Sequence, residues 1–211
     1  MVKVIAVDGP AGAGKSTVSK IVAARLGFTY IDTGAMYRAV GLKLARTGAV
    51  LAEIVESIEI ELDDKARVFL DGVEVTAEIR TPEISRLASD VSKFGFVRKK
   101  LTELQRKMAQ RGSVIMDGRD IGTEVLPNAD VKIFLTASLD ERARRRFEEL
   151  KAKGQAVDFD AIKAEIAARD KQDSEREIAP LKQAPDAVLV DSTHLTIEET
   201  VARILAICST H

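Results

Sequence analysis

The chain has 211 residues, of which 45% are hydrophobic and 31% are charged. This length predicts one compact unit with a sizeable core, and the composition is that of a globular protein rather than a disordered one. The 32 basic and 33 acidic residues leave a net charge of −1, which argues against a protein that coats nucleic acid through bulk positive charge. One cysteine and two histidines are too few for a disulfide framework or an ordinary zinc site. No apolar run approaches the roughly 18 residues of a membrane span.

The first elements alternate between strand and helix patterns. Residues 2–7 form a β-branched run typical of a strand buried on both faces, and a glycine-rich turn follows. Apolar residues at helical spacing predict a helix over 15–26, and 28–31 is a second strand-like run. A strand, a helix and a strand in this order form a βαβ unit, so we expect the two strands to be parallel.

A different pattern begins after a predicted helix at 34–47. Residues 58–62 alternate apolar and acidic side chains, which is typical of a half-buried strand. The strand-like runs 67–70 and 73–75 flank an Asp-Gly pair, a strong signal for a two-residue hairpin. These features predict a small antiparallel sheet inserted into an α/β chain.

Helix and strand patterns alternate again in the rest of the chain. Helical spacing recurs over 82–91, 96–111, 139–153, 158–173 and 196–207, and strand-like apolar runs occupy 113–116, 131–135 and 187–190. The whole pattern predicts a five-stranded parallel sheet covered by helices on both faces, in which ligands bind beyond the carboxyl ends of the strands. Three polar loops are expected there, at 8–16, 32–38 and 117–122.

The segment 9–16, Gly-Pro-Ala-Gly-Ala-Gly-Lys-Ser, matches the phosphate-binding pattern G-x-x-x-x-G-K-[ST] at every constrained position. Glycines let the backbone wrap around phosphates with several N–H groups pointing inward, and the following helix adds its N-terminal dipole. In such loops the lysine, here Lys15, reaches the β- and γ-phosphates, and the hydroxyl of Ser16 can ligate Mg²⁺. The motif predicts a nucleoside triphosphate site without specifying the reaction.

Phosphate loops of this kind serve GTPases, ATPases and small-molecule kinases. The single asparagine of the chain does not belong to an Asn-Lys-x-Asp element, which disfavours a guanine-reading switch. Arginines favour phosphoryl transfer, because planar guanidinium groups neutralise phosphate oxygens bidentately. Arg38 and Arg119 follow predicted strand ends, and the segment 142–146 holds four arginines. That cluster is equally consistent with a solvated helix face paired to nearby glutamates.

Four further motifs make the pattern more specific. They are Asp-Thr-Gly-Ala-Met-Tyr-Arg at 32–38, Glu-Ile-Arg-Thr at 78–81, Asp-Gly-Arg-Asp-Ile-Gly-Thr at 117–123 and Ala-Pro-Leu at 179–181. Together with the phosphate loop they resemble the bacterial-type cytidylate kinase family, and the resemblance runs from residue 2 to about 205. The motifs at 32–38 and 117–123 are much more specific than the phosphate loop.

The resemblance implies MgATP-dependent phosphorylation of CMP and dCMP by a monomeric cytoplasmic enzyme with no nucleic-acid or membrane partner. It also implies the P-loop NTPase type of α/β fold, with a helical lid and an enlarged acceptor-binding part. The expected parts are a core at 1–32, 110–138 and 180–211, a CMP-binding part at 33–109 with the antiparallel insert near 58–76, and a lid at 139–179.

Family roles carry over to matching positions. The residues implied for ATP are Gly9, Pro10, Ala11, Gly12, Ala13, Gly14, Lys15, Ser16, Thr17 and Arg142. Those implied for CMP are Thr33, Arg38, Ser89, Arg98, Arg119, Asp120, Arg169, Asp173 and Arg176. Those implied for catalysis are Lys15, Arg38, Arg119, Arg145 and Arg176, and Ser16 with Asp117 would hold Mg²⁺.

Base recognition by Ser89, Arg98 and Asp120 has a physical rationale. Cytosine presents an amino donor beside two acceptors, so a carboxylate suits the donor and a guanidinium suits the acceptors. Uracil has an acceptor oxygen in place of the amino donor, so Asp120 would face an oxygen. A buried polar group left unpaired in this way costs about 1–3 kcal/mol, which favours CMP over UMP.

Several roles have alternatives. Asp117 either holds a Mg²⁺-bound water or caps the neighbouring loop, and Asp8 braces Lys15 or has a similar metal role. Asp173 and Arg169 could form an ordinary i,i+4 surface pair. Tyr37 is expected to be a packing residue.

Three other functions compete with a CMP kinase. The first is another small P-loop kinase, acting on a different mononucleotide, shikimate or a coenzyme precursor. The second is an interaction protein that uses ATP as a switch. The third is a nucleic-acid-binding module, which the 4% aromatic content and the absence of tryptophan disfavour.

Overall fold

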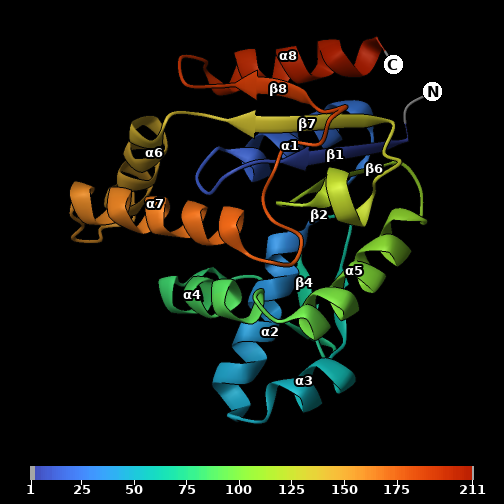
Figure 1. Ribbon diagram of the computed structural model, residues 1–211, viewed down its shortest axis with the longest axis vertical. Helices are drawn as coiled ribbons and strands as arrows, with labels where there is room; N and C mark the ends of the chain where they lie inside the picture. The colour runs from blue at the N-terminus through green and yellow to red at the C-terminus, as the bar shows by residue number, and fades with distance from the viewer. Residues whose placement is uncertain (1–2, 211) are drawn as a thin grey trace.

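A parallel sheet forms the centre of the molecule (Figure 1). In the computed structural model, which describes residues 3–210, five strands pair in the order β2-β6-β1-β7-β8, and every pairing is parallel. Their bounds are β1 Val4–Asp8, β2 Thr29–Asp32, β6 Val114–Asp117, β7 Val131–Thr136 and β8 Val188–Asp191. The predicted sheet is confirmed, with its first strand beginning at Val4. Residues 1, 2 and 211, which the expected strand 2–7 and core include, lie outside the described residues.

Helices cover both faces of this sheet, which explains why its strands are almost continuously apolar. On one face, α1 (Lys15–Leu26) and α8 (Ile197–Ser209) pack against Ile5 and Val7 of β1. The intervening Ala6 points to the other face and joins the larger core beneath α2 (Thr33–Thr47).

The lower half of Figure 1 contains α2, four further helical segments and a small sheet. The four segments are α3 Leu51–Ser57, the 3₁₀ turn Glu78–Arg80, α4 Pro82–Val91 and α5 Gly95–Ala109, and a π-helical turn, Ile121–Val125, follows β6. The short helix α3 and these two turns were not predicted, because each is too short to show a hydrophobic period.

The predicted antiparallel insert is confirmed. It consists of β3 (Ile60–Leu62), β4 (Val68–Leu70) and β5 (Val73–Glu74), paired in that order. Asp71 and Gly72 have φ values of 50° and 79°, the left-handed pair that a tight hairpin between twisted strands requires.

Helices α6 (Leu139–Ala152) and α7 (Phe159–Glu175) lie side by side at one edge of the molecule (Figure 1). They share a hydrophobic cluster of their own, separate from the two main cores, that includes Leu150 and Ile162. Within residues 3–210, no helix is long and apolar enough to cross a membrane.

Candidate active site

The phosphate loop connects β1 to α1 at the carboxyl edge of the sheet. A Cβ atom on Gly9 would lie 1.9 Å from the carbonyl oxygen of Leu135 on the neighbouring strand, so only glycine fits there. Lys15 opens α1, and its Nζ donates to the carbonyl oxygens of Gly9 and Pro10 at 2.7 Å each. Burial, with the nearby guanidinium of Arg119, lowers the pKa of Lys15. The ammonium is therefore held inside the loop at an electrostatic cost.

A carboxylate meets this loop from the adjacent strand. Asp117 ends β6, and its Oδ2 accepts a hydrogen bond of 2.8 Å from the hydroxyl of Ser16. Its Oδ1 accepts from the phenol of Tyr30 at 3.0 Å. Burial and the neighbouring Asp32 raise the pKa of Asp117, while Lys15 opposes the shift. The two residues predicted for Mg²⁺ are thus in direct contact, and Asp117 faces the phosphate loop.

Asp8, at the end of β1, binds the backbone of another loop. Its two carboxylate oxygens accept from the amides of Ile121 and Gly122 at 2.8 and 2.7 Å. Burial raises the pKa of Asp8 to about 6 in spite of these hydrogen bonds. Its hydrogen bonds therefore brace the segment that follows Arg119 and Asp120, rather than Lys15.

One cavity of about 700 Å³ connects the phosphate loop with α2, α4 and α5 and with α6 and α7. Its lining includes every predicted site residue except Gly9, Pro10 and Arg142. The structure therefore brings together side chains from six separate segments of the chain, although their individual roles stay predictions.

A buried ion pair lies at the end of the cavity that α4 and α5 line. The guanidinium of Arg98 on α5 donates to Asp120, and their side chains are only 5% and 8% exposed. Arg98 also lies over the ring of Tyr37, 5.5 Å from its centroid. Arg176 lies 3.6 Å from the other oxygen of Asp120. Tyr37 is half-buried and packs against the core, and desolvation of its phenol raises its pKa to about 12, so the phenol stays neutral.

Three guanidinium groups converge in the middle of the cavity. Arg38 donates to Asp32 at 2.9 Å, and Arg119 donates to Asp173 of α7 at 2.9 Å. Burial and the charge of Arg119 lower the pKa of Arg169 to about 10. Among the described residues, the Nε atoms of Arg38 and Arg169 are buried without a hydrogen-bond partner. Buried N–H groups and mutual repulsion of this kind favour an anionic ligand.

The arrangement excludes one of the two predictions for Asp173 and leaves its binding of the acceptor a prediction. Its side chain is buried, and it pairs with Arg119 across the cavity rather than forming an exposed pair along α7. Burial alone would raise the pKa of Asp173, but Arg119 and Arg169 hold it below its usual value. The hypothesis of an ordinary surface pair is therefore wrong.

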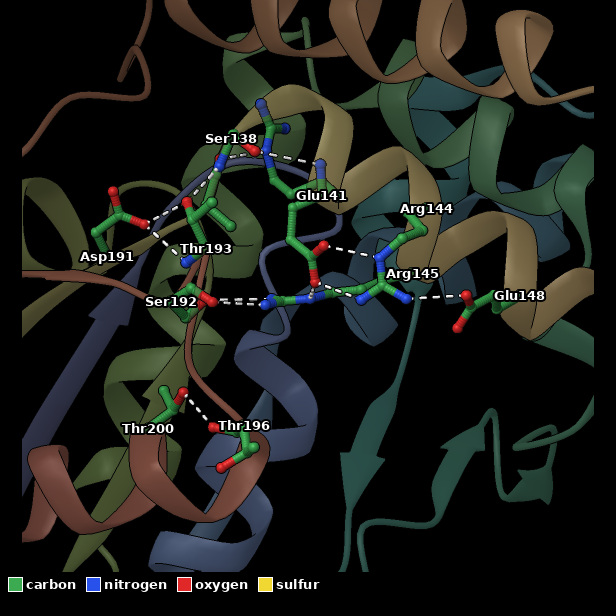
Figure 2. Close-up of polar contacts among 12 residues, drawn as sticks. Ser138, Glu141, Arg144, Arg145, Glu148, Asp191, Ser192, Thr193, Thr196 and Thr200 are labelled. Atoms are coloured by element: carbon green, nitrogen blue, oxygen red, sulfur yellow. Dashed lines mark hydrogen bonds and ion pairs between the residues drawn. The ribbon is translucent and has the colours of Figure 1, made fainter.

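Three arginines of the cluster on α6, Arg144, Arg145 and Arg146, line the cavity. Figure 2 shows the carboxylate of Glu141 between Arg144 and Arg145, whose Nε atoms each lie 2.8 Å from it. The hydrogen bonds from Arg144 and Arg145 lower the pKa of Glu141 to about 2. Arg145 also donates to the carbonyl of Ser192 at 2.7 Å, on the loop that follows β8. Arg144 is about half exposed and pairs with Glu141 and Glu148, as expected of a solvated helix face, whereas a contact of Arg145 with ATP phosphates stays a prediction.

Arg142 lies behind the phosphate loop and does not reach the cavity. Its guanidinium donates to the carbonyl oxygens of Ala11 and Ala137 at 2.9 Å each, and to Asp170 of α7 at 2.6 Å. Asp170 in turn accepts from the amide of Ala11 at 3.2 Å. In this structure its buried guanidinium braces the loop, and the expected contact of Arg142 with ATP phosphates stays a prediction.

The loop after β8 is a part of the cavity that the sequence analysis missed. Its lining members are Ser192, Leu195, Thr196, Ile197 and Thr200. Figure 2 shows Ser192 facing Arg145, with Thr196 and Thr200 at the start of α8. Its position in the sequence could have predicted this, because the loop follows the carboxyl end of a predicted strand, as the three predicted polar loops do.

The fold and the phosphate loop define a protein of the P-loop NTPase type of α/β fold. A shikimate kinase from Acinetobacter baumannii superposes with a TM-score of 0.52, at 16% identity, over 100% of this chain and 94% of the other. A second shikimate kinase, from Bacteroides thetaiotaomicron, gives a TM-score of 0.51 at 15% identity, over 98% of both chains. At these identities the likeness shows the fold alone.

Sequence comparison identifies the family within this class. A model of the cytidylate kinase family matches residues 5–210. The cytidylate kinase of Caldicellulosiruptor bescii is 54% identical over 210 residues, which cover 95% of this chain and 93% of that protein. The cytidylate kinase of Symbiobacterium thermophilum is 52% identical over 215 residues, which cover 97% and 95%. The chain belongs to the cytidylate kinase family, as its motifs predicted.

Proposed function

We propose that this chain transfers the γ-phosphate of ATP to CMP or dCMP, giving CDP or dCDP and ADP. The observation that carries the proposal is one cavity that joins a phosphate loop to three converging guanidiniums and then to a buried Arg98–Asp120 pair. Membership of the cytidylate kinase family supports the identity of both nucleotides.

The donor would bind at the core side of the cavity. Its phosphates would lie against the backbone of residues 11–17, with Lys15 moving from the loop carbonyls to the β- and γ-phosphates. Its base would lie toward Leu195 and Ile197, beside the guanidinium of Arg145. Arg142 and Asp170 would brace the loop from outside.

The acceptor would bind at the opposite end. Arg38 and Arg119 would hold the phosphate of CMP, with Arg169 beside them, because a dianion relieves the repulsion among these guanidiniums. Asp120 would accept from the cytosine amino group, and Arg98 would donate to its acceptors. Thr33 and Asp173 would approach the sugar and phosphate, and Ser89 would contact the base.

The transfer needs no protein nucleophile. An ionised oxygen of the CMP phosphate attacks the γ-phosphorus, the new P–O bond forms, and the bond from that phosphorus to the β,γ-bridging oxygen breaks as ADP leaves. Charge on the transferring group would be stabilised by Lys15, Arg38, Arg119, Arg145 and Arg176. Helices α6 and α7 would cover the site and exclude water, which limits hydrolysis of ATP.

The residues of the site fit a Mg²⁺ ion. The Ser16 hydroxyl and the Asp117 carboxylate offer adjacent hard oxygens, 2.8 Å apart, beside the phosphate loop. Residues 3–210 contain no group of three or more His, Cys, Asp or Glu side chains able to hold a metal on their own. Mg²⁺ usually takes one or two protein ligands together with phosphate oxygens and water. When bound, it would neutralise charge on the β- and γ-phosphates.

We also infer the larger organisation from the family. The core would comprise 1–32, 110–138 and 180–211, the CMP-binding part 33–109, and the lid 139–179. The separate hydrophobic cluster between α6 and α7 supports a lid that moves as one body. From the family we also infer a monomeric cytoplasmic enzyme without nucleic-acid or membrane partners. The net charge of −1 supports the last point, because it gives no bulk attraction to nucleic acid or to an anionic membrane.

An acceptor panel tests this function. The purified chain, with MgATP, is assayed for ADP release with CMP, dCMP, UMP, AMP, GMP and shikimate. We expect CMP and dCMP to give by far the highest kcat/KM. Preference for another acceptor would leave a P-loop kinase but contradict the assignment to CMP, and nucleotide binding without transfer would contradict a kinase.

A further inference from the structure

A residue of α7 that no motif singled out contacts the base end of the cavity. Gln172 directly precedes Asp173, and its side-chain amide reaches Ser89 on α4, on the other side of the cavity. Its Nε2 lies 2.7 Å from the Ser89 hydroxyl oxygen and 3.1 Å from the Ser89 carbonyl oxygen. Gln172 therefore links the lid helix to a residue that lines the cavity.

The contact with the carbonyl fixes the orientation of the amide. A backbone carbonyl oxygen can only accept a hydrogen bond, so the nitrogen of Gln172 must face it. An amide NH₂ group can only donate, so it also donates to the Ser89 hydroxyl oxygen. The hydroxyl thus accepts from the lid, and its own hydrogen is left to donate elsewhere.

The end of α4 explains why the lid binds here. The helix ends at Val91, so the Ser89 carbonyl lies in its last turn, where intrahelical N–H partners are missing. The hydroxyl of Ser92 donates to this carbonyl at 2.7 Å, and Gln172 donates to it as well. Two donors fill the two lone pairs of the oxygen.

We propose that Gln172 is a positioning residue for acceptor recognition, which fixes the Ser89 hydroxyl as a hydrogen-bond donor toward the base pocket. Ser89 lines the same cavity wall as Ala88, Ser92 and Arg98. The oriented hydroxyl would donate to an acceptor atom of the bound base, and only while α7 contacts α4. This inference rests on the proposed function, because it assumes that a nucleoside monophosphate occupies this end of the cavity.

Two substitutions test whether Gln172 must donate a hydrogen bond to Ser89. Gln172→Leu keeps a similar volume and removes the donor, so we expect KM for CMP to rise about three- to tenfold, with kcat and KM for ATP nearly unchanged. Gln172→Glu replaces the donor with a carboxylate, which would draw the Ser89 hydrogen toward the lid and repel the Ser89 carbonyl. We expect a larger rise in KM for CMP than Gln172→Leu gives. A value for Gln172→Glu equal to that of the wild type would overturn the proposal.

A double-mutant cycle separates orientation of the hydroxyl from simple helix capping. Ser89→Ala removes the hydroxyl and keeps the carbonyl, so Gln172→Leu should have no further effect on KM for CMP in that background. An equal rise in both backgrounds would mean that Gln172 only caps α4, and the proposal would fail. The matched control is Lys171→Gln, an exposed neighbour on α7, which should behave as the wild type.

The activity of the wild-type enzyme distinguishes a failure of this inference from a failure of the proposed function. Thermal unfolding of each variant first verifies that it is folded. If the wild type makes no CDP from CMP and ATP, the proposed function fails and this inference falls with it. If the wild type makes CDP and the Gln172 variants match its KM for CMP, only this inference fails.

Discussion

Ser16 and Asp117, which are 101 residues apart in the chain, share a hydrogen bond of 2.8 Å between the serine Oγ and the aspartate Oδ2. The contact joins the start of α1 to the end of β6, because β6 pairs with β1 in parallel register. One polar pair therefore connects the phosphate loop to the loop that carries Arg119 and Asp120. A hydroxyl beside a carboxylate offers the hard oxygen atoms that the proposed Mg²⁺ ion would require.

Asp117→Asn should lower kcat about 10- to 100-fold, in the range seen when a group that orients a metal shell is lost. The concentration of Mg²⁺ that gives half-maximal rate should rise as well, since the amide carries no charge. Titration of initial rate against Mg²⁺ at saturating ATP and CMP measures both effects. An unchanged Mg²⁺ dependence would mean that Asp117 only caps the neighbouring loop.

Lys15→Met should lower kcat/KM for ATP about 100- to 1,000-fold, as expected when one preorganised cationic donor is removed from the transferring phosphate. The fold should survive, because burial lowers the pKa of Lys15 and a buried charge is no source of stability at neutral pH. Steady-state kinetics and thermal unfolding of the same sample test both parts. An active, folded Lys15→Met variant would refute the role assigned to Lys15.

The five-stranded sheet and the hairpin insert could be predicted because each carries a local signal. Buried strands are short apolar runs, and the Asp71-Gly72 pair adopts the positive φ values that its chemistry permits. The short helix α3 lacks such a signal: of its seven residues only Ile54 and Val55 are buried, which is too little to reveal a period. Tertiary packing, rather than local sequence, forms it.

Asp120→Asn should reduce the preference for CMP over UMP by about tenfold or more. An asparagine amide can still accept from Arg98, and it can turn its NH₂ group toward the O4 atom of uracil. The substitution is preferable to alanine, because removing one member of a buried ion pair destabilises the fold by roughly 3–5 kcal/mol. The ratio of kcat/KM for the two nucleotides is the measurement, and an unchanged ratio would show that Asp120 does not read the base.

Asp8 makes the stability of the fold depend on pH. Burial raises its pKa from 3.8 to about 6, so between these values the folded state holds a proton that the unfolded state has lost. The contribution of Asp8 to the free energy of unfolding is complete below pH 3.8, and it is lost as the pH rises through 6. From pH 5 to 7 we expect Asp8 to lower the free energy of unfolding by about 1 kcal/mol. Asp117, whose pKa is also raised, acts in the same direction.

Asp8→Asn is the control for this pH dependence. The variant should be less stable at every pH, since one amide of the π-helical turn loses its acceptor. Its free energy of unfolding should nevertheless fall less between pH 5 and 7 than that of the wild type. Denaturant unfolding at the two pH values measures the difference, and equal slopes would show that Asp8 does not titrate in this range.

The site was predicted less completely than the fold. Motifs placed Lys15, Arg119 and Asp120 correctly in the cavity, because their spacing from strand ends is fixed in the sequence. Which guanidinium faces inward could not be predicted for α6, since neighbouring arginines differ only in their rotation about the helix axis. That rotation is set by packing against the phosphate loop, which turns Arg142 toward Ala11 and Asp170, and Arg145 toward Ser192.

Direct tracing of the phosphate tests the central claim, transfer between two bound nucleotides without a protein intermediate. The wild type is incubated with Mg²⁺, CMP and ATP labelled in the γ-phosphate, and the products are separated. The account predicts that the label appears in the β-phosphate of CDP, in amounts equal to the ADP formed. Label that appears only as inorganic phosphate, or remains on the protein, would contradict it.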